Sequence, residues 1–375
     1  MFNWQVLKLL KRVIKILNFT RAFALRWDDS KNSLFPVNSN RRLIFIQALF
    51  IHQLLYGFYI GWKFYAIWVS TFATVMDSFW FMFMNLGYLF CAEGLIQSAL
   101  RRNEYSELFR HLLHLDGKFI GLCGGKRITH ETKSKIALWI LRINVVGTFV
   151  FIILLTLVFI KRPTSFFYIY DLYPDHESWA IFSIFLVFEI LSKSIGVIAF
   201  NLMSTWFLLS VAFQFMALAQ LRKSTDHVGK RIAYYKYLAI FNKCHMNCYL
   251  PITLPSRLTL FGLLVVISAH LLLRYGHRLI LFERFLVFQL LLWSIVTAFL
   301  CILVSGKIYK SSSRALVRFR SYDKHTKYTR KSLRALRPFG VKAGPSKTLT
   351  YGTLNAYSVV VLKALTTILV RFPPR

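Results

Sequence analysis

Residues 338–372 read PFGVKAGPSKTLTYGTLNAYSVVVLKALTTILVRF, and this last stretch of the chain decides the fold. A loop that contains Gly340, Gly344 and Pro345 leads into a mostly apolar segment. At about 1.5 Å per residue, the roughly 24 residues of this segment are enough for a helix to cross a bilayer. The sequence therefore predicts a membrane-spanning helix at the carboxyl end.

The predicted helix is not apolar on every side. Polar residues fall near one face at helical spacing, interrupted by Leu362. They are Thr348, Tyr351, Asn355, Ser358 and Thr366. Lipid does not favour such a stripe, so it either packs against other helices, which is the commoner arrangement, or lines a water-filled path.

The composition extends this reading to the whole chain. Its 375 residues are 56% hydrophobic and 17% aromatic, and the mean hydropathy is +0.49, which is too apolar for a soluble domain of this size. We expect an all-α, polytopic membrane protein. The net charge of +33 lies between the apolar segments, where it meets lipid head groups, so no nucleic-acid partner is expected.

The apolar segments predict seven crossings. They lie at about 43–61, 71–97, 136–160, 179–218, 258–273, 285–305 and in the last stretch. The fourth segment is longer than a crossing needs. We interpret it as one crossing whose helix continues into the cytoplasm through residues 230–244; a re-entrant pair of helices is the alternative. Residues 4–17 predict an amphipathic helix in the membrane interface, and residues 101–135 contain a second amphipathic helix.

The basic residues predict the orientation. With the amino terminus in the cytoplasm, 37 of the 48 Lys and Arg lie on the cytoplasmic side, 8 lie outside and 3 lie within crossings. We therefore expect a cytoplasmic amphipathic segment (1–42), a bundle of six helices with cytoplasmic loops (43–305), a basic cytoplasmic loop that forms an anchor region (306–347), and a seventh helix with a short extracellular tail (348–375).

Enzyme and metal chemistry find little support in the sequence. Cys244, His245 and Cys248 lie close together, but a structural zinc site needs four ligands, so ordinary packing is expected. There is no His-rich intramembrane motif, and the five cysteines predict no disulfide framework. We expect no catalytic residues, no metal and no cofactor.

Ionisable residues within crossings are the best candidates for a binding site. Burying each in the bilayer costs free energy unless it is paired with another side chain or hydrated. Glu189 and Lys193 are four residues apart and are expected to pair. Acidic, polar and aromatic side chains at similar predicted depth in the outer half of the bundle are candidates to line a pocket open to the outside, with acids for a cation and rings for stacking. They are Asp77, Trp80, Phe185, Glu189, Gln289 and Trp293.

The final stretch also resembles the insect gustatory receptors, of the seven-helix insect chemoreceptor superfamily. The family pattern has a V-x-A-G turn, which is present here as residues 341–344, and a last helix that ends in Thr-Tyr, five apolar residues and Gln-Phe. Phe372 and the apolar spacer match. Ala364 and Leu365 replace Thr and Tyr, and Arg371 replaces Gln.

The resemblance implies a tetrameric, ligand-gated, non-selective cation channel in the plasma membrane of chemosensory neurons. Homotetramers and heterotetramers with related receptors both remain open. The seventh helices are expected to line the pore, with Asn355, Ser358 and Thr366 on the polar face and Leu365, Leu369 and Phe372 as hydrophobic gate residues.

Arg371 is the main departure from the family pattern, because four copies would repel cations near the gate. Four explanations stay open. The four Arg371 side chains face neighbouring helices or reach the membrane surface, the helix bends, or this subunit works only beside partner subunits that carry Gln at this position. The small-molecule tastant is expected to be bitter, aversive or a pheromone rather than a sugar. A membrane receptor that signals through another protein, or a transporter, is the alternative function.

Overall fold

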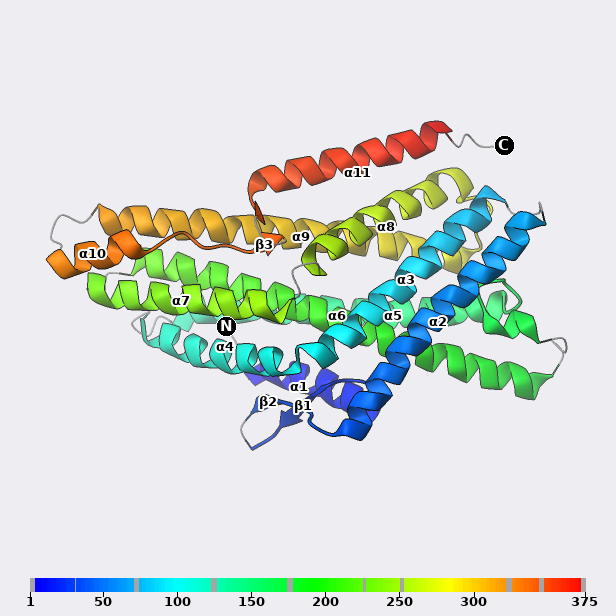
Figure 1. Cartoon of the computed structure of the whole chain (residues 1–375), viewed down its shortest axis with the longest axis horizontal. Coiled ribbons are helices and arrows are strands. Elements are labelled where there is room, and N and C mark those ends of the chain that lie inside the picture. The colour runs from blue at the N-terminus through cyan, green and yellow to red at the C-terminus, as the bar shows by residue number, and fades with distance from the viewer. Residues whose placement is uncertain are drawn as a thin grey trace.

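The apolar segments form long helices in the computed structural model of the chain, which describes residues 4–30, 32–70, 74–122, 127–173, 178–224, 227–249, 253–321, 326–343 and 347–371 (Figure 1). Among these residues, seven helices are long and apolar enough to cross a membrane, as the sequence predicts. They are α2 (Asn40–Val69), α3 (Val75–Leu100), α5 (Arg127–Lys161), α6 (Trp179–Lys223), α8 (Thr253–Tyr275), α9 (Leu281–Arg320) and α11 (Tyr351–Arg371).

The remaining elements are shorter and connect or flank these helices. The helical ones are α1 (Trp4–Phe19), α4 (Arg102–Leu122), the 3₁₀ turn η1 (Ile169–Leu172), α7 (Val228–Cys248) and α10 (Lys327–Ala335). Two small antiparallel hairpins pair β1 (Leu25–Asp28) with β2 (Ser33–Pro36), and β3 (Lys342–Ala343) with β4 (Lys347–Thr348).

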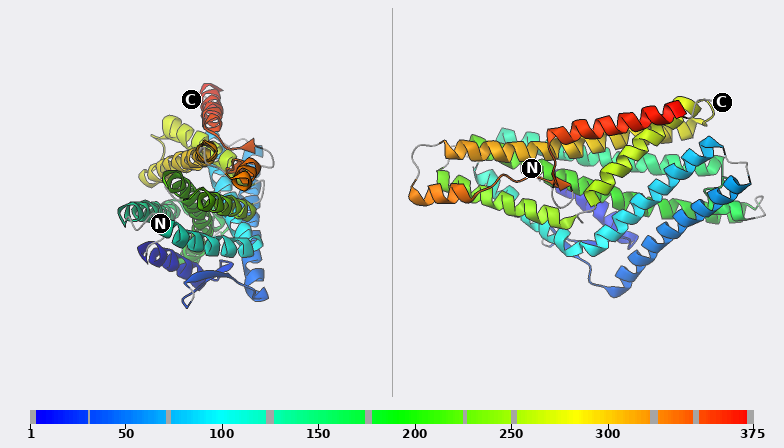
Figure 2. Two further views of the ribbon diagram at one scale, coloured as in Figure 1. Left: turned by 90° about the vertical axis from the view of Figure 1, so that its left-hand side faces the viewer. Right: turned by 45° about the horizontal axis from the view of Figure 1, so that its top comes forward.

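The two ends of the molecule differ. One end carries the carboxyl ends of α2, α5, α8 and α11 (Figure 1). At the other end, the extensions of α6 and α9 lie beside α7 and α10. Seen end-on, α11 lies at one edge of the bundle, and α1 with the β1–β2 hairpin lies at the opposite edge (Figure 2).

Helix α1 packs on protein along its apolar face. Val6, Leu10, Ile14 and Leu17 are at most 1% exposed, and α1 contacts α5, α6 and β1. The prediction of an amphipathic helix is confirmed, and the structure adds that this apolar face packs on protein. The neighbouring helices, rather than lipid, remove that face from water. The position of α1 in the membrane interface stays a prediction.

The long fourth apolar segment forms one unbroken helix, α6, so no re-entrant pair is present. The predicted continuation through residues 230–244 is wrong. Helix α6 ends at Lys223, and Ser224 adopts an extended backbone conformation. The side chain of His227 then accepts a hydrogen bond from the Gly229 N–H at 3.2 Å and caps the new helix α7. This turn lets α7 pack against both α6 and α4.

The basic segment 306–347 is mostly helix rather than loop. Helix α9 runs on without a break from the apolar segment to Arg320, and α10 follows it. Alternating small and large residues allow this extension to pack: Ser312 donates to the Phe339 carbonyl at 2.7 Å, and Phe319 is fully buried. The charge pattern identifies an exposed segment but not its secondary structure, since Lys and Arg are good helix formers.

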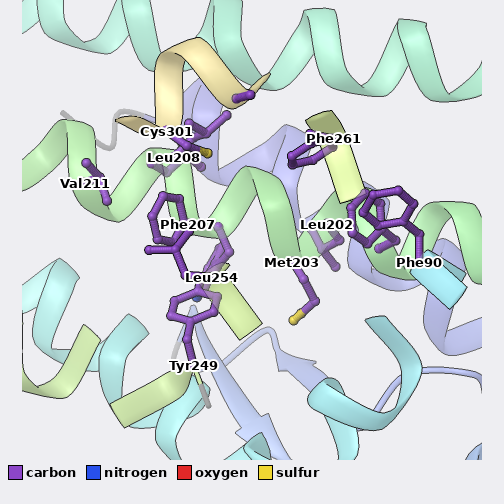
Figure 3. Packing of buried hydrophobic residues seen from close by; sticks show 14 of the residues in the cluster. Phe90, Leu202, Met203, Phe207, Leu208, Val211, Tyr249, Leu254, Phe261 and Cys301 are labelled. Carbon is purple, nitrogen blue, oxygen red and sulfur yellow. The ribbon is translucent and has the colours of Figure 1, made fainter. Parts of the chain in front are cut away.

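The core is centred on α6, which contacts α3, α5, α7 and α9. Its buried side chains include Leu202, Met203 and Phe207, which pack among residues of α3, α8 and α9 (Figure 3). Helices α3 and α6 approach closely at two glycines. A Cβ atom at Gly94 would lie 2.7 Å from the Phe200 Cα, and one at Gly196 would lie 2.4 Å from the Cys91 Cβ. Such contacts between small residues are typical of membrane helix packing.

A buried polar network joins α3, α4 and α8. The guanidinium of Arg257 donates to both carboxylate oxygens of Glu93 at 2.9 and 3.1 Å, and to the Gln97 side-chain oxygen at 3.0 Å. Gln97 in turn donates to the Tyr105 hydroxyl at 2.6 Å. The Arg257 side chain is 6% exposed, so the loss of its partner would leave an uncompensated buried charge.

We expect Arg257→Met to lower the free energy of unfolding by about 3–5 kcal/mol, because Glu93 would lose its counter-ion in a site with little water. Thermal unfolding of the purified protein would measure this. The double variant Arg257→Met/Glu93→Leu removes both charges and should recover most of the stability. A double variant no more stable than Arg257→Met would contradict the role of the ion pair.

His245 on α7 is fully buried, and its Nδ1 lies 2.8 Å from the Ser210 Oγ. Burial lowers the pKa of this imidazole to about 3. In the unfolded chain the group takes up a proton near its ordinary pKa of about 6.5. Between these two values the unfolded state therefore binds more protons than the folded state, and acidification destabilises the fold.

We expect the contribution of His245 to appear as a loss of up to about 1.4 kcal/mol of unfolding free energy per pH unit, as pH falls from about 6.5 to about 3. His245→Gln should show a shallower dependence on pH than the parent protein over this window. Thermal unfolding of both proteins at matched pH values measures the difference, which isolates His245 from other histidines. Parallel curves would refute the assignment.

Candidate functional site

A largely apolar cavity lies among five of the membrane-spanning helices. Its walls come from α3, α5, α6, α8 and α9, and its volume is about 90 Å³. Aromatic rings form much of the lining, notably Phe83, Phe90, Phe151, Phe200 and Trp293. A concave apolar site with a few polar groups is typical of small-molecule binding.

Two glycines keep this cavity open. Gly87 on α3 and Gly147 on α5 both line it, and a Cβ atom at either position would meet no other atom within 4 Å. A larger residue would therefore point into free space at these positions. The absence of side chains at these two positions contributes directly to the volume of the cavity.

Two of the six ligand-binding candidates line the cavity. Trp293 packs edge-to-face against Phe200 and Phe261, each with ring centroids 5.7 Å apart. Gln289 lies one turn earlier on α9, and its amide nitrogen donates to the Gly147 carbonyl at 2.7 Å. Both side chains are half-buried.

Three other candidates lie elsewhere. Asp77 caps α3, since its carboxylate accepts from the Thr74 backbone N–H at 2.9 Å. Trp80 is buried against Phe167 and Phe83. Phe185 packs edge-to-face on Tyr170 at 5.4 Å. None of these three residues is among those that line the cavity, because position along a crossing gives depth but not the direction in which a side chain points.

Glu189 is paired, as the spacing predicts. Its carboxylate lies 2.6 Å from the Lys193 Nζ, and it accepts a hydrogen bond from the Tyr56 hydroxyl. Lys193 Nζ also lies 4.2 Å from the centroid of the Tyr168 ring. Lys193, but not Glu189, lines the large cavity. The wall therefore presents an ammonium group, and the predicted acid for a cationic ligand is already neutralised behind it.

Sequence reasoning missed most of the lining. The sequence indicates Lys193 only as the partner of Glu189, and it does not single out Asn201, Gly87 or Gly147 as site residues. A usable signal was present, because polar or very small residues within a crossing often face protein or a cavity rather than lipid. Phe83 and Phe90 carry no such signal, since aromatic residues face lipid and core alike.

Helix α11 lies on the flank of the bundle, against α8 and α9. Leu354, Tyr357 and Ile368 face the bundle, whereas the predicted pore residues Asn355, Ser358 and Thr366 are exposed. The polar stripe therefore faces away from the described helices of its own chain. Leu365 and Leu369 are half-buried beside it, Arg371 is exposed at the helix end, and Phe372 lies outside the described residues.

The cavity and α11 share two supporting helices. Leu264 of α8 and Leu290 of α9 line the cavity. Two residues before Leu264, Gly262 allows α11 to approach, since a Cβ atom there would lie 3.3 Å from the Val361 side chain. A change in the packing of α8 or α9 around a bound molecule would therefore act directly on α11.

No family model and no curated protein matches the chain. Solved structures do. One is the insect olfactory receptor OR5 from Machilis hrabei, with 12% identity and a TM-score of 0.70 over 96% of this chain and 97% of that chain. Another is the same receptor in complex with eugenol, with 14% identity and a TM-score of 0.72 over 97% of this chain and 98% of that chain.

These similarities extend over nearly the full length of both chains. At such low identity they show a shared fold, and that fold is the seven-helix fold of an insect olfactory receptor. The resemblance of the final stretch to insect chemoreceptors is thus confirmed at the level of the fold.

Proposed function

We propose that this chain is a gustatory receptor subunit of the insect chemoreceptor superfamily, which forms a ligand-gated, non-selective cation channel as a homo- or heterotetramer. A small molecule binds in the cavity among α3, α5, α6, α8 and α9. The α11 helices of the four subunits surround the pore. The proposed location is the plasma membrane of chemosensory neurons, with the amino terminus in the cytoplasm and the carboxyl terminus outside.

One observation carries this proposal: α11 rests on the two helices that form one wall of the cavity. A ligand that binds one packing arrangement of α8 and α9 better than another shifts the population toward that arrangement. Because α11 packs on both helices, the shift reaches the proposed pore. The exposed polar face of α11 supports the pore role, since this face finds no partner helix among the described residues of the chain.

Further observations support the kind of ligand, the orientation in the membrane and the gustatory branch. A receptor of this fold has been solved in complex with eugenol, which supports a small organic ligand in this chain as well. The distribution of Lys and Arg supports the orientation, because 37 of 48 lie on the side of the amino terminus. The turn and apolar spacer of the final stretch support the gustatory branch, with a bitter, aversive or pheromone ligand.

Patch recording from membranes that contain the purified chain, alone and with related receptors, tests the channel function. Ligand-evoked current in excised patches without nucleotides is expected for a channel and not for a receptor that signals through another protein. A carboxyl-terminal epitope tag should stain cells that have not been permeabilised. Absence of current from every combination over a broad set of tastants would refute the proposal, and a tag accessible only from the cytoplasm would refute the orientation.

A further inference from the structure

The polar groups of the cavity define the kind of ligand that fits, if the cavity is the ligand site of the proposed function. Its lining is mainly apolar, and among its polar side chains are Lys193, Asn201 and Gln289. Each of the three is held by contacts within the protein. Those contacts fix which atoms remain for a ligand.

Asn201 has a fixed amide orientation. The Thr148 hydroxyl donates its one hydrogen to the Asn144 carbonyl at 2.7 Å. It must therefore accept at its contact with Asn201, 2.7 Å away, and the Asn201 Nδ2 is the donor. The Asn201 Oδ1 is buried and has no hydrogen-bond partner among the described residues. It remains as a free acceptor in a side chain that is 8% exposed.

Gln289 is fixed in the same manner from another helix. Its Nε2 donates to the Gly147 carbonyl at 2.7 Å, and a carbonyl can only accept. The Gln289 Oε1 is also buried without a partner in the described part of the chain. Since Gly147 and Thr148 are adjacent on α5, the amides from α6 and α9 are anchored at neighbouring points of the wall. Both unsatisfied oxygen acceptors therefore belong to side chains that line the cavity.

Lys193 supplies the complementary group. An ammonium carries three N–H donors. The Glu189 carboxylate, 2.6 Å away, occupies one direction, and the Tyr168 ring covers another. The position of Lys193 in the cavity lining leaves a donor for a ligand oxygen. Its positive charge also disfavours a second cation nearby.

We propose that the ligand is a neutral, largely apolar molecule with a hydroxyl group, either an alcohol or a phenol. A hydroxyl both donates to an amide oxygen and accepts from Lys193. An ether or ketone only accepts, so it leaves the amide oxygens unsatisfied. The positive charge of Lys193 repels a protonated amine, and the two amide oxygens repel a carboxylate. The hydroxyl is the common polar group that satisfies both kinds of partner.

Four probes on one carbon skeleton test this: 2-phenylethanol, its methyl ether, 2-phenylethylamine and phenylacetate. Calorimetric titration of the purified full-length protein measures binding independently of current. We expect 2-phenylethanol to bind at least about tenfold more tightly than each of the other three, which corresponds to one lost buried hydrogen bond. Equal or tighter binding of the ether, amine or acid, or no binding of the alcohol, would overturn the proposal.

Asn201→Leu and Gln289→Met remove the two acceptors with little change in volume. Because a hydroxyl has one hydrogen to donate, the double variant should weaken binding of 2-phenylethanol about tenfold and leave binding of the methyl ether unchanged. An equal loss for both probes would indicate damage to the cavity and would count against the assignment. An alcohol preference without evoked current would uphold the ligand class and refute the channel function. Evoked current without an alcohol preference would uphold the channel function and refute the ligand class.

Discussion

Leucine in place of Gly87 is expected to reduce ligand sensitivity by about 100-fold or more, with the fold intact. Gly87 lines the cavity from α3, and a Cβ atom there would meet no protein atom within 4 Å, so the new side chain enters the space proposed for the ligand. Overfilling a well-packed site costs about 1–3 kcal/mol or more, which is a factor of about 5–150 or more in affinity. Concentration–response recording measures the shift.

The matched control is Gly117→Leu, which makes the same substitution on α4. Gly117 also has open space at its Cβ position but lies outside the cavity lining. Both variants should keep the thermal stability of the parent protein, because leucine is a better helix former than glycine. Gly147→Leu fills the same space from α5. A normal response from both Gly87→Leu and Gly147→Leu would show that ligands act elsewhere.

The number and type of the main helices follow from the sequence because the membrane imposes a strong and local rule. Every backbone group in the bilayer must be satisfied within its own helix, so an apolar run of sufficient length becomes one helix. The segment around Val359 and Val360 illustrates this, since it forms α11 despite its β-branched residues. No long-range information is needed for such a segment.

The candidate site follows less well because it depends on rotation about the helix axes. Gln289 and Trp293 are predicted from their depth in the bundle, and both line the cavity because residues one turn apart share a helix face. Asp77 sits at a predicted depth that suits a pocket, yet it begins its helix and satisfies the capping hydrogen bonds there. Lys193 rather than Glu189 reaches the cavity, although both lie on α6. Only the packing of α6 among its neighbours decides between them.

The helix ends outside the membrane were predicted poorly for a related reason. Water can satisfy backbone groups there, so length alone does not decide where a helix ends. The Ser224 turn and the cap at His227 separate α7 from α6 through local hydrogen bonds. The extension of α9 to Arg320 depends instead on packing of Ser312 and Phe319.

Removal of the charge at Lys363 is expected to raise cation conductance about tenfold in channels formed by this chain alone. Lys363 lies in the middle of α11 and is exposed, on the side that faces away from the bundle. The segment 338–372 contains no acidic residue to balance it. Four such ammonium groups around a narrow pore would repel entering cations, and Lys363→Gln removes this barrier. Single-channel recording measures the conductance, and Lys363→Glu should increase it further.

Salt dependence separates a pore charge from a change in packing. The effect of Lys363→Gln should shrink as ionic strength rises, because mobile ions screen exposed charges. Arg142→Gln is the matched control, since Arg142 is also exposed within a membrane span but belongs to α5. It should leave conductance unchanged. If Lys363→Gln and Arg142→Gln behave alike, the Lys363 face of α11 contacts a neighbouring subunit or lipid instead of the ion path. The pore face would then be the adjoining strip of Asn355 and Ser358, and substitutions there would have to carry the conductance effect.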